Sequence, residues 1–322
     1  MGKIVLHLGY PKTGTTYLQR QIFSQAVASH TVVTPTFDNC DLNIARFMHE
    51  IETAQLSDKT RLTVTGKPLI LSLEGFLFEA MRFVVDNKFV PRSFPRALEG
   101  LQQLCSHTSP AEIDIVIYLR RQDELAHSLY AESYTYQLRF APDLDTIEKY
   151  VDQITSEPST ATHPGWYYDF SRTLDEIRSV FPQSNLHVRF YEDLAHSPEQ
   201  ELAFWSGLTG VHFAYAGTRE NVRSSASNSK IADQPNLRVL AVRLKTRFLP
   251  NLKLPRAFSK LAVAVLSRFK FGTPPNIELT PRLARKIREH FGPRNKALFQ
   301  AESLQPTAWA EHYSDVDHPA CS

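Results

Sequence analysis

Residues 3–16 read KIVLHLGYPKTGTT, an apolar run followed by a short loop rich in glycine and threonine. The apolar run predicts a buried β-strand over residues 3–8. A helical pattern follows over about residues 15–29, where Leu18, Ile22, Phe23 and Ala26 share one side. Backbone N–H groups at such a loop and at the start of the helix form a site for an anion such as phosphate. The sequence therefore predicts a strand–loop–helix unit that binds phosphate.

The loop differs from the phosphate loop of kinases and ATPases, which reads G-x-x-x-x-G-K-[ST]. Gly9 and Gly14 have its glycine spacing, and Thr16 fills its last place. Thr15 stands where the lysine belongs, and the lysine is instead at position 12. We therefore expect a phosphate-binding loop whose lysine does not occupy the usual γ-phosphate position. The alternative is a tight turn with an ordinary helix cap.

Further strands and helices alternate along the chain. Apolar runs predict strands over residues 69–73, 113–119 and 186–191. Helical patterns cover about residues 123–140, 166–181 and 280–290, and another helix begins at Ser197-Pro198 with Gln200 closing a capping box. This alternation predicts an α/β fold, a three-layer P-loop-like domain with a mostly parallel central sheet flanked by helices and a helical C-terminal portion.

The composition excludes several classes of protein. The chain has 322 residues, 42% of them hydrophobic, and a formal net charge of +2, too mild to predict nucleic-acid binding. No apolar run approaches the roughly 20 residues that span a bilayer, and none at the start has the roughly 7–15 residues of a signal-peptide core. Cys40, Cys105 and Cys321 lie far apart, which predicts neither disulfides nor a cysteine zinc site. We therefore expect a cytoplasmic protein.

Four stretches carry a resemblance to a known family. Residues 11–16, PKTGTT, resemble the 5′-phosphosulfate loop of sulfotransferases that use 3′-phosphoadenosine 5′-phosphosulfate (PAPS). That family binds the 3′-phosphate with an arginine at the end of a strand and a serine eight residues later, and Arg120 and Ser128 have this spacing. The stretches RFYEDL at 189–194 and GPRN at 292–295 resemble further parts of these enzymes, in the same order.

The resemblance implies one sulfotransferase domain over residues 1–322, with a nucleotide-binding core at 1–233 and a basic helical part at 234–322. It implies PAPS as co-substrate, adenosine 3′,5′-diphosphate (PAP) as product, and no required metal. The donor-binding residues that it implies are Pro11, Lys12, Thr13, Gly14, Thr15, Thr16, Arg120 and Ser128. By the same resemblance, Lys12 stabilises charge on the bridging oxygen of the leaving phosphate, and Thr15 and Thr16 hold the 5′-phosphate.

The predicted strand 113–119 is followed by Arg120, where a kinase would have the aspartate that holds Mg²⁺. Residues 69–74 can still be read as the end of a metal-binding strand. For neighbouring Arg121 we expect a salt bridge rather than a ligand contact. Glu192 and Asp193 follow another strand, and we expect structural caps and pairs from them.

An acceptor hydroxyl must lose a proton, so a general base is needed. Glu74 is the first candidate because it follows a predicted strand, and ligands of open parallel sheets lie beyond the carboxyl ends of strands. In the family that the chain resembles, several carbohydrate sulfotransferases use a glutamate in a similar region, while the small-molecule branch uses a histidine. The alternatives for Glu74 are a pair with Arg82 or a helix cap. His127 is the second candidate for the base, while His7, inside the first strand, is expected to be a packed histidine.

The acceptor is less constrained by the sequence. The polar stretch 221–230 is similar to a loop that closes over the nucleotide in related enzymes, so Arg223 and Lys230 are weaker candidates for donor contacts; an ordinary surface loop is the alternative. Residues 234–277 contain nine Lys and Arg and no acidic residue. This segment can form a solvated helical face, bind an anionic acceptor, or contact an anionic membrane through residues 238–270.

We therefore expect a small-molecule or glycan acceptor, with the hydroxyl on a carbohydrate or glycolipid. An anionic, lipid-linked glycan would suit both the basic segment and a location at the inner face of the membrane. Two other functions stay open. A P-loop kinase would require ATP and Mg²⁺, and a non-catalytic relative would bind nucleotide without turnover. The sequence leaves the acceptor and the oligomeric state undetermined.

Overall fold

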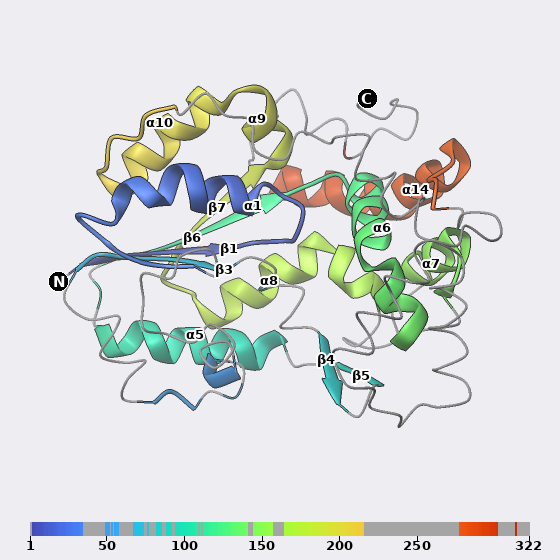
Figure 1. Ribbon diagram of the computed structural model, residues 1–322, viewed down its shortest axis with the longest axis horizontal. Coiled ribbons are helices and arrows are strands. Elements are labelled where there is room, and N and C mark those ends of the chain that lie inside the picture. The colour runs from blue at the N-terminus through green and yellow to red at the C-terminus, as the bar shows by residue number, and fades with distance from the viewer. Residues whose placement is uncertain are drawn as a thin grey trace, which may run out of the picture.

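The computed structural model describes residues 2–34, 49–51, 53, 55–57, 67–73, 76, 82–85, 88–91, 94–108, 110, 112–140, 144–156, 164–215, 277–301 and 313. A five-stranded sheet lies at its centre, in the order β2-β3-β1-β6-β7 (Figure 1). The strands are β1 Lys3–Leu8, β2 Thr31–Val33, β3 Leu69–Leu73, β6 Glu112–Leu119 and β7 Asn185–Phe190. All four neighbouring pairs are parallel, which confirms the α/β class and the mostly parallel sheet.

Helices cover both faces of the sheet (Figure 1). One face carries α9 Tyr191–His196, α10 Pro198–Thr209 and the helix after β1, which comprises α1 Thr15–Tyr17, η1 Leu18–Ile22 and η2 Phe23–Ala26. The other face carries α5 Phe94–Thr108 and α8 Phe170–Val180. These are the three layers that the sequence predicts.

Beyond one end of the sheet lie α6 Gln122–Phe140, α7 Ile147–Ile154 and α14 Pro281–Ala301 (Figure 1). Helix α14 contacts α6, α7 and α8. The short 3₁₀ helix η4, Pro164–Tyr168, precedes α8, and a separate antiparallel pair comprises β4 Arg82–Val85 and β5 Lys88–Pro91.

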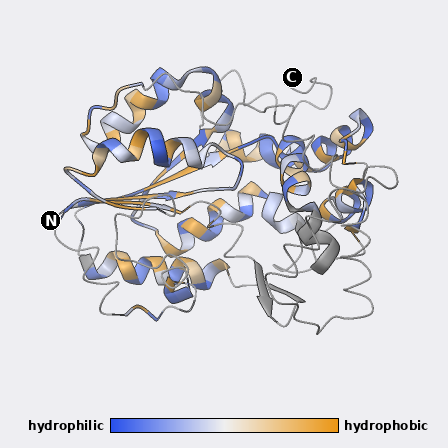
Figure 2. Ribbon diagram, viewed as in Figure 1, coloured by the Kyte–Doolittle hydropathy of each residue, from blue (hydrophilic) through white to orange (hydrophobic). Residues whose placement is uncertain are grey.

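Alternate residues of the central strands enter two different hydrophobic cores. In β1, Ile4, Leu6 and Leu8 pack with α5 and α8, whereas Val5 packs with Phe23 and Trp205 on the opposite face. Both faces are therefore covered, so the strands read as nearly unbroken apolar runs (Figure 2). A shift of one residue in the pairing of a strand would move each of its side chains to the opposite face of the sheet. Packing on both faces therefore fixes the register, and the register sets which strand ends lie together.

Two helix boundaries differ from the sequence prediction. The helix predicted over residues 166–181 is divided at Asp169, whose side chain accepts a hydrogen bond from Arg172 N and caps α8. The helix predicted to stop near residue 290 continues to Ala301 with Pro293 inside it. Buried Phe291 and Phe299 keep this last part of α14 against the core. The helix end predicted near residue 290 is therefore wrong.

The start of α10 is partly as predicted. Ser197 is the N-cap and Pro198 the first helical residue, but the Ser197 side chain makes no capping hydrogen bond. Instead, the Ser197 carbonyl accepts from Gln200 N at 3.0 Å, so the predicted capping box is wrong. Within the described parts of the chain, no helix combines the length and apolar character needed to cross a membrane. Most of the basic segment 234–277 lies outside the described residues.

Candidate functional site

Three segments meet at the carboxyl edge of the central sheet. Strands β1, β6 and β7 are neighbours and run parallel, so their carboxyl ends share that edge. Residues 9–14 follow β1, Arg120 and Arg121 follow β6, and α9 follows β7. Ligands of open parallel sheets bind at such an edge. The candidate site is therefore built from the segments that the sequence singled out.

The two glycines of the loop are required by close contacts. Gly14 has φ +80°, in the left-handed region, and a Cβ added there would lie 2.5 Å from Leu194 Cδ2. A Cβ on Gly9 would lie 2.7 Å from Thr15 Oγ1. The Tyr10 carbonyl accepts a hydrogen bond from Thr13 Oγ1 at 2.6 Å, which closes the loop on itself. The loop is thus held tightly between β1 and α9.

Lys12 lies at the tip of this loop in a strained backbone conformation. It is the one described non-glycine residue with positive φ, at +67°. A left-handed conformation costs a residue with a Cβ about 1–2 kcal/mol, and such strain is concentrated at functional sites. The Lys12 ammonium lies 3.0 Å from Glu132 Oε1 on α6. The loop therefore holds a lysine over the carboxyl edge, directed toward α6.

Arg120 occupies the centre of the site and contacts the Lys12 loop directly. Its Nη1 donates to the Lys12 carbonyl oxygen at 2.8 Å, and its Nη2 donates to Glu124 Oε2 at 3.0 Å. The guanidinium carbon lies 4.7 Å from the centre of the Tyr191 ring, in cation–π contact. Its Nε is buried and has no acceptor among the described residues. The structure therefore puts Arg120 in direct contact with the loop that carries Lys12, the two cationic residues that the sequence predicts for donor binding.

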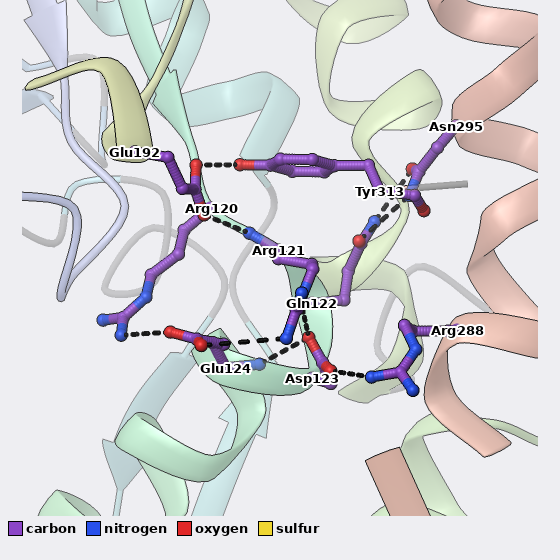
Figure 3. A network of polar contacts seen from close by, with 9 residues as sticks. All are labelled: Arg120, Arg121, Gln122, Asp123, Glu124, Glu192, Arg288, Asn295 and Tyr313. Atoms are coloured by element: carbon purple, nitrogen blue, oxygen red, sulfur yellow. Dashed lines mark hydrogen bonds and ion pairs between the residues drawn. The ribbon is translucent and has the colours of Figure 1, made fainter. Parts of the chain in front are cut away.

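A buried network of hydrogen bonds and ion pairs lies next to Arg120 and supports its position (Figure 3). Arg121 Nε donates to Asp123 Oδ1 at 2.7 Å, and Arg288 Nη1 of α14 donates to Asp123 Oδ2 at 2.6 Å. The salt bridge predicted for Arg121 is therefore confirmed. All three side chains are buried, and Asp123 carries the charge opposite to that of the two arginines. Their contacts therefore fix the start of α6 against α14.

Glu192 joins this network from α9 (Figure 3). Its Oε2 accepts from the Tyr313 hydroxyl at 2.7 Å, and its Oε1 accepts from Arg121 N at 3.3 Å. Burial raises the pKa of the Glu192 carboxyl, while these two hydrogen bonds act in the opposite direction. The Tyr313 carbonyl in turn accepts from Asn295 Nδ2. The structural role predicted for Glu192 is confirmed.

Helix α6 presents one face to both cations. Glu124 contacts Arg120 and Glu132 contacts Lys12. Ser128 lies midway between the two glutamates, and residues four apart are neighbours on a helix surface. Ser128 is therefore on the face that serves the site, in the second turn of the helix as predicted. The neighbouring His127 is half-buried, and its role as a base stays a prediction.

Two threonines of the loop, Thr13 and Thr15, donate to the backbone of the loop itself. Besides Thr13, Thr15 directs its Oγ1 to the Tyr10 carbonyl, at 3.5 Å. The participation of Pro11, Thr13, Thr15 and Thr16 in donor binding stays a prediction. The loop carries the Lys12 ammonium and leads directly into the backbone at the start of α1.

His7 is a packed histidine, as predicted. It is fully buried, its Nδ1 lies 2.8 Å from Ser72 Oγ, and Phe23, Tyr118 and Trp205 surround it edge-on. Burial lowers the pKa of His7 to about 3. The ring is therefore neutral at physiological pH and contributes no charge to the carboxyl edge.

Some predicted site residues lie outside the described residues: Glu74, Arg223 and Lys230. Their assignments stay predictions. Among the described residues, no three His, Cys, Asp or Glu side chains gather closely enough to hold a metal ion. The expectation of a metal-independent reaction also stays a prediction.

Sequence reasoning missed Tyr191 and both glutamates of α6 as members of the site. Glu124 lies four residues after Arg120 and Glu132 another eight on, a spacing that marks one helix face and could have been noticed. Tyr191 was visible within residues 189–194, but the sequence gives no indication that its ring lies beneath Arg120.

Comparison of the sequence with protein-family models gives no match, and comparison with curated proteins gives none either. Among solved structures, a sulfotransferase from Alicyclobacillus acidocaldarius matches with 15% identity and a TM-score of 0.41, over 78% of this chain and 96% of that chain. Mouse sulfotransferase SULT7A1 complexed with PAP matches with 13% identity and a TM-score of 0.38, over 97% of this chain and 87% of that chain. Neither likeness assigns a role to a residue of this chain.

Proposed function

We propose that this chain transfers the sulfuryl group of PAPS to an acceptor hydroxyl. The observation that carries the proposal is the contact between the Arg120 guanidinium and the Lys12 backbone carbonyl, 2.8 Å long, at the carboxyl edge of the sheet. PAPS has two separate anionic centres, and the site has two cationic residues on two segments that are in direct contact.

In this proposal, each cation serves one end of the donor. The Lys12 ammonium, the loop amides and the start of α1 bind the 5′-phosphosulfate. The Arg120 fork binds the 3′-phosphate, for which its buried Nε–H without an acceptor is a suitable donor. Ser128 adds a hydroxyl from the same face of α6. The Tyr191 ring keeps the guanidinium plane in place.

The reaction breaks the bond between sulfur and the bridging oxygen and forms a bond from sulfur to the acceptor oxygen. Charge then grows on the leaving 5′-phosphate, where Lys12 stabilises it. The acceptor proton goes to a general base, for which Glu74 is the first candidate and His127 the second. Transfer of this kind depends mainly on positioning and charge stabilisation.

The proposed acceptor is a hydroxyl of a carbohydrate or glycolipid. The motive for it is the resemblance of the loop and strand ends to sulfotransferases, together with the basic character of residues 234–277. A cytoplasmic location, with contact to an anionic membrane through residues 238–270, accompanies this part of the proposal. Co-sedimentation with anionic liposomes at low salt tests the membrane contact, and its absence would remove that part alone.

The test of the main proposal is thermal unfolding of the full chain with PAP, compared with ADP and with ATP plus Mg²⁺. A ligand at about 100 times its dissociation constant stabilises the folded state by about 2.7 kcal/mol, which raises the melting temperature by a few degrees. We expect PAP to raise it more than ADP does. A rise with ATP and Mg²⁺ only would favour a kinase, and no rise with any nucleotide would overturn nucleotide-dependent transfer.

A further inference from the structure

Helix α6 supplies a carboxylate to each cation of the candidate site. Glu124 Oε2 lies 3.0 Å from Arg120 Nη2, and Glu132 Oε1 lies 3.0 Å from Lys12 Nζ. The two glutamates are eight residues apart on one helix face, with Ser128 between them. The same helix thus supplies the counter-ion of both positive charges.

The two ion pairs differ sharply in their surroundings. The Arg120 and Glu124 side chains are 6% and 16% exposed, and the guanidinium is also held by the Lys12 carbonyl and the Tyr191 ring. The Lys12 and Glu132 side chains are 36% and 56% exposed. The first pair is therefore part of the buried framework, while the second is accessible to solvent and to a ligand.

An exposed pair of this kind is easily replaced. Surface lysine–glutamate pairs contribute little because water and salt screen them and both side chains lose freedom on pairing. A phosphosulfate group offers Lys12 a fixed anion that also accepts hydrogen bonds from the backbone at the start of α1. Lys12 can turn to it on its flexible stem while its backbone stays fixed by Arg120.

We propose that Glu132 is an exchangeable counter-ion of Lys12, which the donor displaces on binding and which returns when the product leaves. This inference rests on the proposed function and deepens it, because it assigns a residue that sets the affinity for donor and product. The displaced carboxylate remains on α6 close to the bound anion, so it repels the 5′-phosphate of PAP. Glu132 thereby weakens the binding of the product and speeds its release.

The test compares PAP binding to the wild-type chain and to Glu132→Gln by calorimetry at low salt. The amide keeps the size of the side chain and removes both the competing ion pair and the repulsion. We expect the dissociation constant of PAP to fall about two- to fivefold, the factor that corresponds to an exposed ion pair. The matched control is Glu99→Gln, an exposed position on α5, which should leave the constant unchanged.

The possible outcomes separate this inference from the proposed function. Equal PAP binding by Glu132→Gln and wild type would overturn the counter-ion role while leaving PAP as ligand. Weaker binding by the variant would overturn it too, because Glu132 would then hold Lys12 in place for the ligand. If neither protein binds PAP, the proposed function fails, and inorganic pyrophosphate becomes the probe. Tighter pyrophosphate binding by the variant would then support the counter-ion role, and any other result would overturn it.

Discussion

The side chain of Arg120 donates a hydrogen bond of 2.8 Å to the backbone carbonyl of Lys12, 108 residues earlier in the chain. The end of β6 therefore supports the loop after β1, and the position of one cation depends on the other. Lys12 is held in its left-handed conformation by a neighbour that is itself fixed by Glu124 and Tyr191. Loss of Arg120 should consequently affect both ends of the proposed donor site.

Arg120→Ala should weaken PAP binding about 10- to 100-fold, because hydrogen bonds to a charged group contribute about 1.5–3 kcal/mol. Arg120→Lys should restore only part of the affinity, since an ammonium lacks the planar fork. Isothermal titration with PAP measures both effects. Arg178→Ala, at an exposed pair with Asp175, is the control. Unchanged PAP affinity in Arg120→Ala would refute the 3′-phosphate assignment.

Glu74→Gln should lower turnover by about 10²- to 10⁴-fold while PAP binding stays at its wild-type value. The amide keeps the shape of the side chain but cannot accept the proton of the acceptor hydroxyl. The measurement is PAP formation from PAPS with a panel of carbohydrate acceptors, alongside calorimetry with PAP. A near-normal rate in Glu74→Gln would move the base to another residue, with His127→Gln as the next variant to test.

Gly14→Ala should lower the free energy of unfolding by about 1–3 kcal/mol, as judged by urea denaturation. The added methyl group would lie 2.5 Å from Leu194 Cδ2, and the residue would keep φ at +80°. The matched control is Gly207→Ala in α10, where nothing lies within 4 Å of an added Cβ. That change should raise stability by about 0.5–1 kcal/mol. Equal effects of the two substitutions would contradict the close contact between the loop and α9.

The buried His7 predicts a loss of stability in acid. Its pKa is lowered to about 3 in the folded chain and is about 6.5 when unfolded, so between these values only the unfolded state binds the proton. Stability should therefore fall as the pH falls below 6.5, by up to about 1.4 kcal/mol per pH unit.

Urea unfolding at pH 7.5 and pH 5.5 measures this loss. His7→Gln should show a smaller difference between the two conditions than the wild type, although its stability at pH 7.5 is expected to be lower. His212→Gln, at an exposed position, should keep the full difference. If His7→Gln loses as much stability between pH 7.5 and pH 5.5 as the wild type does, the buried neutral His7 is not the cause of that loss.

Sequence reasoning was most successful where local pattern and packing agree. The runs at residues 3–8, 69–73 and 113–119 are apolar on both faces, as strands between two helical layers must be. The positions of Arg120 after a strand and of Ser128 in the second turn of the next helix were also foreseen, while their role in donor binding, implied by the family resemblance, stays a prediction. The arrangement of these elements then follows from parallel pairing.

Prediction failed where a tertiary contact overrides the local signal. Gly292 and Pro293 indicate a helix end, yet α14 continues because residues on both sides of them are buried against the core. The strand β2 has only three residues and no distinct pattern. The contact of Lys12 with Glu132 joins residues far apart in sequence, and no spacing rule foretells it.

The hydroxyl of Tyr313 reaches Glu192 beside the candidate site, and this has a consequence for biosynthesis. A ribosome adds Tyr313 after every other member of the network in Figure 3. Until then the Glu192 carboxylate lacks its hydroxyl donor, so the emerging chain completes this edge of the sheet late. A premature stop between codons 295 and 313 would yield a polypeptide that contains all the proposed donor-binding residues. Its Glu192 carboxylate would lack the Tyr313 hydroxyl, and quality control by proteases should remove this polypeptide faster than the full chain.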